Sequence, residues 1–273
     1  MVSDSTFDRA YGYWFKRYAA WVRSQFGTFE PEAAYSHEVV MKWLSELAAQ
    51  GCKPSTVNTA AHAVRYFAEL EGYELKFKRG DLPSIKTTVP ESISEDEVWR
   101  LVEGTPDPRD KAIIALMYDC ALRLSELVSL NVEDVDLEDG TVFVRERKGA
   151  ETYGLPQKIP FSEKTRQVLE EYLRLRLSVP ASSDALFLGD KGRIDRSTVY
   201  RIVRKAGERV LGKKIRPHVL RHTRAIVLRR KGWLVEDVKD FLGHISSKTT
   251  MRYARIEPSD LKRKLEEIGE RHG

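Results

Sequence analysis

The sequence predicts a two-domain protein that is mainly α-helical and carries one small antiparallel β-sheet. Helical periodicity dominates on both sides of residues 81–92, a stretch with two prolines and no regular spacing of apolar residues. Only residues 141–145 and 157–161 show the two-residue periodicity that is typical of β-strands. A chain of 273 residues also exceeds one average domain. We therefore expect a helical domain over residues 1–80, a linker over 81–92 and a second domain over 93–273.

Three helices are predicted in the first domain. Residues 5–26 carry aromatic and apolar side chains every three or four positions, the period of an amphipathic helix. A second helix follows Ser36, a residue type that caps helix N-termini, and ends before Gly51. A third runs from Pro54 to Leu70. We expect the aromatic side chains of these helices to form a core rather than a surface on which DNA bases stack.

Capping signals mark the helices of the second domain. Ser94 and Glu97 show the pattern of a capping box, and Asp107, followed by a proline, begins an apolar helix. The two alternating segments then predict a β-hairpin with Lys148 near the start of its loop. Asp195 precedes a strongly basic helix. Between the hairpin and that helix lies another helix, whose expected apolar stripe is Val168, Leu169, Tyr172, Leu173 and Leu177.

Composition excludes several classes of protein. The hydrophobic fraction of 41% is too high for a disordered chain. The first residues lack the pattern of a signal peptide, and the longest apolar run, residues 112–118, is far too short to cross a bilayer. Cys52 and Cys120 show no metal-binding spacing, and they favour a reducing compartment. We expect a cytoplasmic protein with no membrane partner.

The distribution of charge indicates a polyanionic partner. The net charge is only +5, but between Arg196 and Lys231 the chain carries thirteen basic residues and a single acidic one, Glu208. A run of one charge sign is usually a solvated surface. The chain as a whole has nearly equal numbers of basic and acidic residues. This strong local excess of positive charge therefore favours a surface that binds a phosphate backbone.

One helical face inside this basic window gathers the side chains of an anion site. Pro217 suits a first helical turn. His218, Arg221 and His222 follow at spacings of three and four residues, so they share one face. Taken singly, each is more often a capping or solvent-exposed side chain. The cluster therefore needs support from the rest of the sequence.

Four residues outside that face give this support. Arg123 lies between two leucines, and it either pairs with Glu126 or is presented into a site. Lys148 belongs to the predicted hairpin loop, where a lysine is usually solvated. Tyr253 follows His244 by nine residues, and alone it would be read as packing.

The combination suits a transesterification of DNA that needs neither metal nor ATP. Two arginines can each direct a pair of donors at phosphate oxygens. A tyrosine can attack phosphorus once a histidine or a positive field offsets its pKa of about 10. A lysine can protonate the leaving 5′-oxygen. The sequence shows no carboxylate cluster for Mg²⁺ and no GxxxxGK[ST] loop, so no cofactor is expected. The six candidates are Arg123, Lys148, His218, Arg221, His244 and Tyr253.

The segments ALRLSEL, PHVLRH, LGH and TTMRY occur in this order. Together they resemble the tyrosine recombinase (phage integrase, Xer-type) family, and the resemblance covers nearly the whole chain. It implies a helical, SAM-like core DNA-binding domain over residues 1–80 and a tyrosine-recombinase catalytic domain over residues 93–273. It also implies a site-specific DNA recombinase that acts on double-stranded DNA through a covalent 3′-phosphotyrosine intermediate.

The resemblance implies a role for each candidate. Arg123 and Arg221 match the arginines that clamp the phosphate, and Tyr253 matches the nucleophile. Lys148 matches the general acid of the hairpin. His218 and His244 match the histidines that assist activation and hold the phosphate. Glu126 matches an acidic position that supports the site, and His222 matches a position often filled by histidine but not usually counted as catalytic.

Two departures from the family pattern stand out. The family usually has Thr-Gly where this chain has Cys120 and Ala121, an exchange of small residues that we expect to be tolerated. The hairpin from Lys148 to Pro160 is longer than the compact form common in the family. Lys158 on the returning strand is therefore the alternative general acid.

The resemblance further implies a homotetramer on paired DNA sites. Residues 258–273 begin with a cap at Ser259 and carry Leu261, Leu265 and Ile268 at helical spacing. We expect this C-terminal helix to pack in trans on a neighbouring protomer.

Two other functions share part of this pattern. A type IB topoisomerase uses the same Arg-Lys-Arg-His-Tyr chemistry without site specificity, but the short two-domain layout and the C-terminal helix favour a recombinase. A non-catalytic DNA-binding protein on the same scaffold would have no use for Tyr253.

Overall fold

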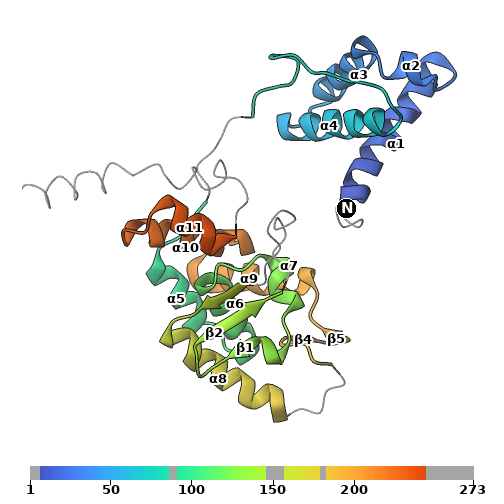
Figure 1. The fold of residues 1–273 in the computed structure, drawn as a ribbon. Coiled ribbons are helices and arrows are strands. Elements are labelled where there is room, and N and C mark those ends of the chain that lie inside the picture. Colours follow the sequence, from blue (N-terminus) through green and yellow to red (C-terminus); the bar gives the residue numbers. More distant parts are fainter. Residues whose placement is uncertain (1–6, 86–90, 146–156, 179–182, 244–273) are drawn as a thin grey trace, which may run out of the picture. The chain divides into compact units, whose positions relative to one another are not determined.

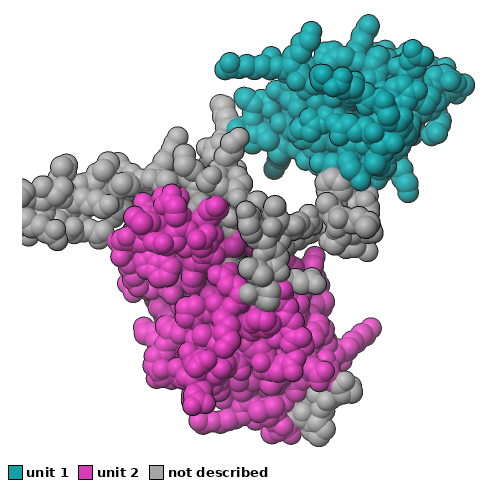
Figure 2. Space-filling view, in the orientation of Figure 1, with its two compact units in different colours: residues 1–88 teal, residues 89–273 magenta. Residues whose placement is uncertain are grey.

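The protein is described by a computed structural model over residues 7–85, 91–145, 157–178 and 183–243. The chain divides into two compact units, Met1–Thr88 and Val89–Gly273 (Figure 2). Each unit has a hydrophobic core of its own. Throughout the described ranges, no helix combines the length and the apolar character needed to cross a membrane.

The first unit is a helical domain built around aromatic side chains. Tyr18 and Trp43 are buried with their ring centroids 4.9 Å apart, so the aromatic stripes form core as predicted. The cap at Ser36 is also confirmed, because its side chain accepts a hydrogen bond from the Val39 amide. The sequence analysis missed the short helix α2. Over its described residues, 7–85, this unit has the helices α1 (Phe7–Phe26), α2 (Pro31–Ala34), α3 (His37–Ala49) and α4 (Pro54–Leu70).

The contacts of the first unit continue beyond residue 80. His37 pairs with Asp81 at 2.8 Å, and the Asn58 side chain donates to the Pro83 carbonyl at 3.3 Å. Leu82 packs against the first core. The start of the stretch expected to be a linker, residues 81–92, therefore belongs structurally to the first unit.

The second unit is mostly helical and carries a small sheet (Figure 1). The capping box of Ser94 and Glu97 and the caps at Asp107 and Asp195 are all present. The part of this unit that the structure describes contains the α-helices α5 (Glu95–Glu103), α6 (Pro108–Asp119), α7 (Leu124–Ser129), α8 (Glu163–Ser178), α9 (Arg196–Leu211), α10 (Pro217–Arg230) and α11 (Val235–Leu242), and a 3₁₀ turn, η1, covers Val132–Asp134.

The two predicted strands pair with each other in a three-stranded antiparallel sheet, in which the first of them is the central strand. Strand β2 (Thr141–Val144) pairs with β3 (Gln157–Pro160), and the buried Val142 lies opposite the buried Ile159. The two-residue strand β1 (Val135–Asp136) adds to the free edge of β2, and it was too short to be detected by alternation. A second, minimal pair joins β4 (Leu188–Gly189) to β5 (Gly192–Arg193). Lys148 lies outside the described residues.

Helix α6 is the centre of the second unit. Residues 112–119 are all buried, and α6 packs against α5, α8 and α10. A helix that is enclosed on every side belongs to the core, so its position is strongly determined. The chain leaves α6 at Cys120 and reaches Arg123 three residues later, so the burial of α6 also fixes where that arginine lies.

The end of α8 differs from the predicted stripe. Leu169, Tyr172 and Leu173 are buried as expected, but Leu177 is 68% exposed. Arg176 is buried in its place, because its guanidinium donates to the carbonyls of Ser183 and Ala185. Providing hydrogen-bond donors for these two backbone carbonyls thus outweighs the burial of one leucine side chain.

The close approach of α9 to the segment before α10 gives a test of this packing. A Cβ added at Gly207 would lie 2.6 Å from Ile215 Cγ1 and 2.7 Å from the Lys213 carbonyl oxygen. Alanine favours a helix over glycine by about 1 kcal/mol, whereas overpacking of this kind costs about 1–3 kcal/mol. We expect Gly207→Ala to lower the free energy of unfolding of the second unit by up to about 2 kcal/mol in urea titration.

The matched control is Gly12→Ala in α1, where an added Cβ meets nothing within 4 Å. At Gly12 only the higher helix propensity of alanine acts, so the free energy of unfolding of the first unit should rise by about 0.5–1 kcal/mol. A stabilised Gly207→Ala variant would contradict the packing described for α9.

Candidate active site

Two arginines from different parts of the second unit converge on one buried carboxylate. Arg123 immediately precedes α7, and its Nη1 donates to Glu126 Oε1 at 2.6 Å. The Arg123 backbone amide donates to the other carboxylate oxygen at 2.8 Å. Arg221, on α10, has its Nη1 3.9 Å from Glu126 Oε2. Glu126 is 1% exposed, so its charge is directed at these two guanidinium groups rather than at water.

The same two arginines also donate to the end of α11. Arg221 Nη2 donates to the Leu242 carbonyl, and Arg123 Nη2 donates to the Gly243 carbonyl at 3.1 Å. The last carbonyls of a helix have no partner within the helix and carry partial negative charge, so they attract cations. Gly243 adopts the left-handed conformation that ends α11. Helix α11 therefore contributes backbone carbonyls to the arrangement of the two arginines.

Ala121 completes the support of Arg221 from the other side. Its carbonyl accepts a hydrogen bond from Arg221 Nη1, and the residue is fully buried. Its φ of 48° is the only positive value among the described residues other than glycine. A left-handed alanine costs roughly 1–2 kcal/mol. That backbone conformation accounts for a small residue here, since a larger or β-branched one would add strain.

The predicted histidine and arginine face is present on α10. Pro217 is at the first helical turn, and the ring centroids of His218 and His222 are 6.4 Å apart. Arg221 is 3% exposed, whereas His218 lies at the surface end of the cluster. Partial desolvation and the positive charges of Arg221 and Arg123 lower the pKa of His218 below its usual 6.5. The His218 imidazole is therefore neutral at pH 7.

The other candidates are not all described. Lys148, His244 and Tyr253 lie outside the described residues. Lys158, the alternative to Lys148, is on β3, where its side chain is 61% exposed and its Nζ is 3.5 Å from Asp139 Oδ2. The described structure thus brings together Arg123, Arg221 and His218, and it places Lys158 on the exposed face of the sheet.

Sequence reasoning missed the backbone partners of the arginines. The carbonyls of Ala121, Leu242 and Gly243 each accept an arginine donor. Every residue has a carbonyl, so no residue type marks them in the sequence. The only available signal was Gly243, which is a typical residue for the end of a helix. Over the described parts of the chain, no group of three or more His, Cys, Asp or Glu side chains is arranged to hold a metal ion.

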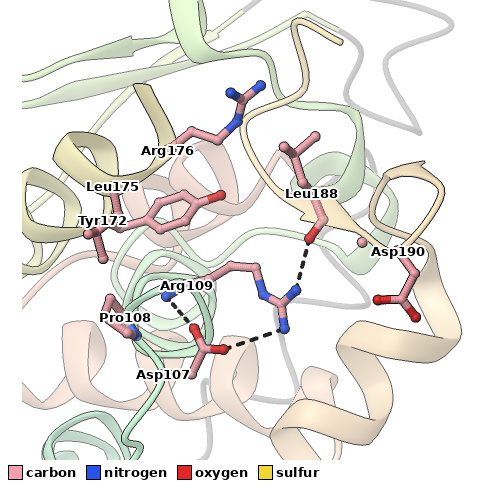
Figure 3. A pocket seen from close by; sticks show the side chains of 9 residues that line it. Asp107, Pro108, Arg109, Tyr172, Leu175, Arg176, Leu188 and Asp190 are labelled. Carbon is pink, nitrogen blue, oxygen red and sulfur yellow. Dashed lines mark hydrogen bonds and ion pairs between the residues drawn. The ribbon is translucent and has the colours of Figure 1, made fainter. Parts of the chain in front are cut away.

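Two pockets in the second unit lie away from the arginine pair. The first, of about 330 Å³, is lined by residues of α6, α8 and β4 (Figure 3). Its Arg109 is already neutralised, because it pairs with Asp110 at 2.9 Å, approaches Asp107 at 3.8 Å and donates to the Leu188 carbonyl. Arg109 is therefore already engaged and is not free to bind an anionic ligand in this pocket.

The second pocket is lined by several basic residues. It has a volume of about 310 Å³ and is lined by Glu91, Tyr200, Arg204, Lys214, Ile215 and Arg216. Three of these residues are basic and one is an aromatic residue at the surface. Arg216 is two residues before His218, so this basic pocket adjoins the start of α10.

Comparisons with known proteins identify the family of this chain. Residues 91–259 match the phage integrase family. The tyrosine recombinase XerA of Pyrococcus furiosus is 32% identical over 232 residues, which are 83% of this chain and 78% of that protein. The crystal structure of a XerA recombinase aligns with a TM-score of 0.59 and 27% identity, covering 97% of this chain and 92% of the other.

A further structural relative shows how far the fold extends. The Tn1549 transposon integrase, in complex with transposon right end DNA, aligns with a TM-score of 0.71 over 97% of this chain and the whole of the other, at 17% identity. At that identity the likeness concerns the fold alone. Taken with the family match and the relative from Pyrococcus furiosus, it leads to one conclusion. The chain belongs to the phage integrase family and is a tyrosine recombinase, an enzyme of site-specific DNA recombination.

Proposed function

We propose that this recombinase cuts and rejoins double-stranded DNA through a covalent 3′-phosphotyrosine intermediate formed on Tyr253, with neither metal nor ATP. The observation that carries the proposal is the convergence of Arg123 and Arg221 on Glu126 and on the last carbonyls of α11. Both guanidinium groups are held before any substrate arrives. Such preorganised donors stabilise the charge that develops on a phosphate in the transition state.

The proton transfers follow from the remaining candidates. The Tyr253 hydroxyl attacks the phosphorus, the bond from phosphorus to the tyrosine oxygen forms, and the bond to the 5′-oxygen breaks. His218, which is neutral at pH 7, and His244 assist the loss of the tyrosine proton and hold the phosphate. Lys148, or alternatively Lys158, protonates the leaving 5′-oxygen. Attack by the 5′-hydroxyl of another strand reverses these steps, so the energy of the phosphodiester is conserved.

DNA is the partner that best suits the surface next to this site. The basic pocket of Arg204, Lys214 and Arg216 offers cations to phosphates, and Tyr200 offers an apolar ring to a sugar or base. Several structural relatives are named as complexes with DNA, including XerH bound to its difH substrate. We assign core DNA binding to the first unit, whose contacts extend past residue 80, and catalysis to residues 93–273.

The nucleophile assignment has a direct test. We expect Tyr253→Phe to bind its DNA site as tightly as the unmodified protein does and to form no covalent adduct on a nicked suicide substrate, read by denaturing gel. Tyr13→Phe, at a residue of α1 that is 55% exposed, is the matched control and should form the adduct normally. An adduct trapped by Tyr253→Phe would show that another residue attacks the phosphorus.

The basic pocket predicts a measurable salt dependence. Replacing both Arg204 and Lys214 by alanine removes two phosphate contacts, and the slope of log K against log salt concentration should flatten by about 1.8. Arg174→Ala is the control, because this α8 side chain is 82% exposed and lies outside the pocket. An unchanged slope in the double variant would exclude the pocket from the DNA interface.

The C-terminal segment is expected to connect protomers in a tetramer on paired DNA sites. Residues 258–273 carry the apolar stripe described above, which needs a partner surface. Truncation after Glu257 should leave the binding of one protomer to one half-site intact and abolish the tetrameric complex in native gels. A tetramer that still forms on paired sites would remove this segment from the assembly.

A further inference from the structure

We propose that Arg224, together with the buried Asp119, is a positioning residue that locks α11 against α6 and so holds the carbonyls to which both phosphate-binding arginines donate. The inference rests on the proposed function, because its effect is expected on DNA cleavage. Neither residue belongs to the predicted catalytic set. Arg224 lies one turn beyond Arg221 on α10, and Asp119 lies two residues before Ala121.

The pair is buried at the end of α6. Arg224 Nη2 is 2.8 Å from Asp119 Oδ1, and Asp119 is fully buried. The second oxygen of Asp119 accepts a hydrogen bond from the Ser162 amide at the start of α8. Burying an ion pair brings little net stability, because the loss of hydration offsets the attraction. Its main effect here is therefore on orientation: it fixes α10 relative to α6 and α8.

The same guanidinium reaches α11 through aromatic rings. Arg224 Cζ is 5.3 Å from the ring centroid of Tyr118, on α6, and 6.0 Å from that of Phe241, on α11. Both distances are within the range of cation–π attraction. Phe241 is directly followed by Leu242 and Gly243, whose carbonyls accept the arginine donors. Arg224 thus contacts the residue that immediately precedes the arginine-binding carbonyls.

A carboxylate on α5 extends the network. Glu95 Oε1 accepts from the Tyr118 hydroxyl at 3.0 Å and lies 4.0 Å from Arg224 Nη1, while Glu95 Oε2 pairs with Lys231 at 3.0 Å. These contacts lower the pKa of Glu95, although its burial opposes the shift. Glu95 therefore stays charged at neutral pH and holds Arg224 and Tyr118 from the outer side.

The two arginines of α10 form parallel connections between the same helices. Arg221 joins the residue that follows the C-cap of α6, Ala121, to Leu242. One turn later, Arg224 joins Asp119 to Phe241. If the second connection is lost, α11 can shift on α6, and the first connection must follow it. Displacement of catalytic groups by about 1 Å can reduce a rate by about 100-fold, whereas phosphate-backbone binding, spread over many contacts, tolerates it.

The experiment uses the full chain and a nicked suicide DNA substrate. The main variant is Asp119→Asn with Arg224→Met, which leaves no unpaired buried charge, keeps an acceptor for the Ser162 amide, and keeps a flexible side chain between the two rings. We expect this double variant to bind DNA within about threefold of the unmodified protein and to melt at a similar temperature. At saturating protein, its first-order cleavage rate should fall at least about 10-fold.

Two further variants separate positioning from general damage. Arg224→Lys keeps a cation beside Asp119 and between the rings, so it should cleave clearly faster than the double variant. Arg174→Met on α8 should behave like the unmodified protein, since this exposed arginine is remote from the network.

Three results would overturn the inference: a double variant that cleaves within about threefold of the unmodified protein, a loss of cleavage that only tracks a loss of melting temperature and DNA affinity, or an Arg224→Lys variant no faster than the double variant. Failure of the proposed function is distinguishable, because the unmodified protein itself would then form no adduct.

Discussion

The arrangement of the site depends on the buried carboxylate of Glu126. Two guanidinium groups brought this close would repel each other and would both lose hydration, a combination that a protein interior tolerates only with compensation. Glu126 supplies that compensation because it is 1% exposed and lies within 4 Å of both arginines. One negative charge between two positive ones leaves the cluster positive. It can therefore be stable without substrate and still attract a phosphate.

Backbone carbonyls add what the single carboxylate cannot. Each arginine has donors left over after Glu126, and the carbonyls of Ala121, Leu242 and Gly243 take some of them. A carbonyl is a dipole and not a full charge, so it fixes the direction of a guanidinium without cancelling its charge. A second carboxylate in the same place would have neutralised the site. Backbone support therefore suits a site that must remain an anion receptor.

Much of the fold and of the candidate site was predictable from the sequence. The rest was not predictable, and the physical reason can be named in each case. Helix starts were predicted because capping is local chemistry, as at Ser94 and Asp107. Arg123 and Arg221 were selected as candidates because few residue types can clamp a phosphate, and the structure brings both to Glu126. Leu177 was placed wrongly because a helical period cannot show where the core ends. Helix α11 was missed, although its final carbonyls are central to the site, because it has only eight residues and begins after Leu234, which is not a residue type that marks a helix start.

The two interpretations of Arg123, as a structural ion pair or as a residue presented into a site, are compatible. Its Nη1 is held by Glu126 at 2.6 Å, and its Nη2 is held by Gly243 at 3.1 Å, so it is a structural residue by any criterion of contact. Its side chain nevertheless remains 20% exposed, so these contacts do not bury it completely. The hydrogen bond to Gly243 also joins positions 120 residues apart, and His244 is the next residue in the chain. The contact that immobilises this arginine thus also anchors the backbone at the point where the segment toward Tyr253 begins. If Arg123 and Tyr253 act as proposed, one hydrogen bond both holds the phosphate clamp and locates the start of the nucleophile's segment.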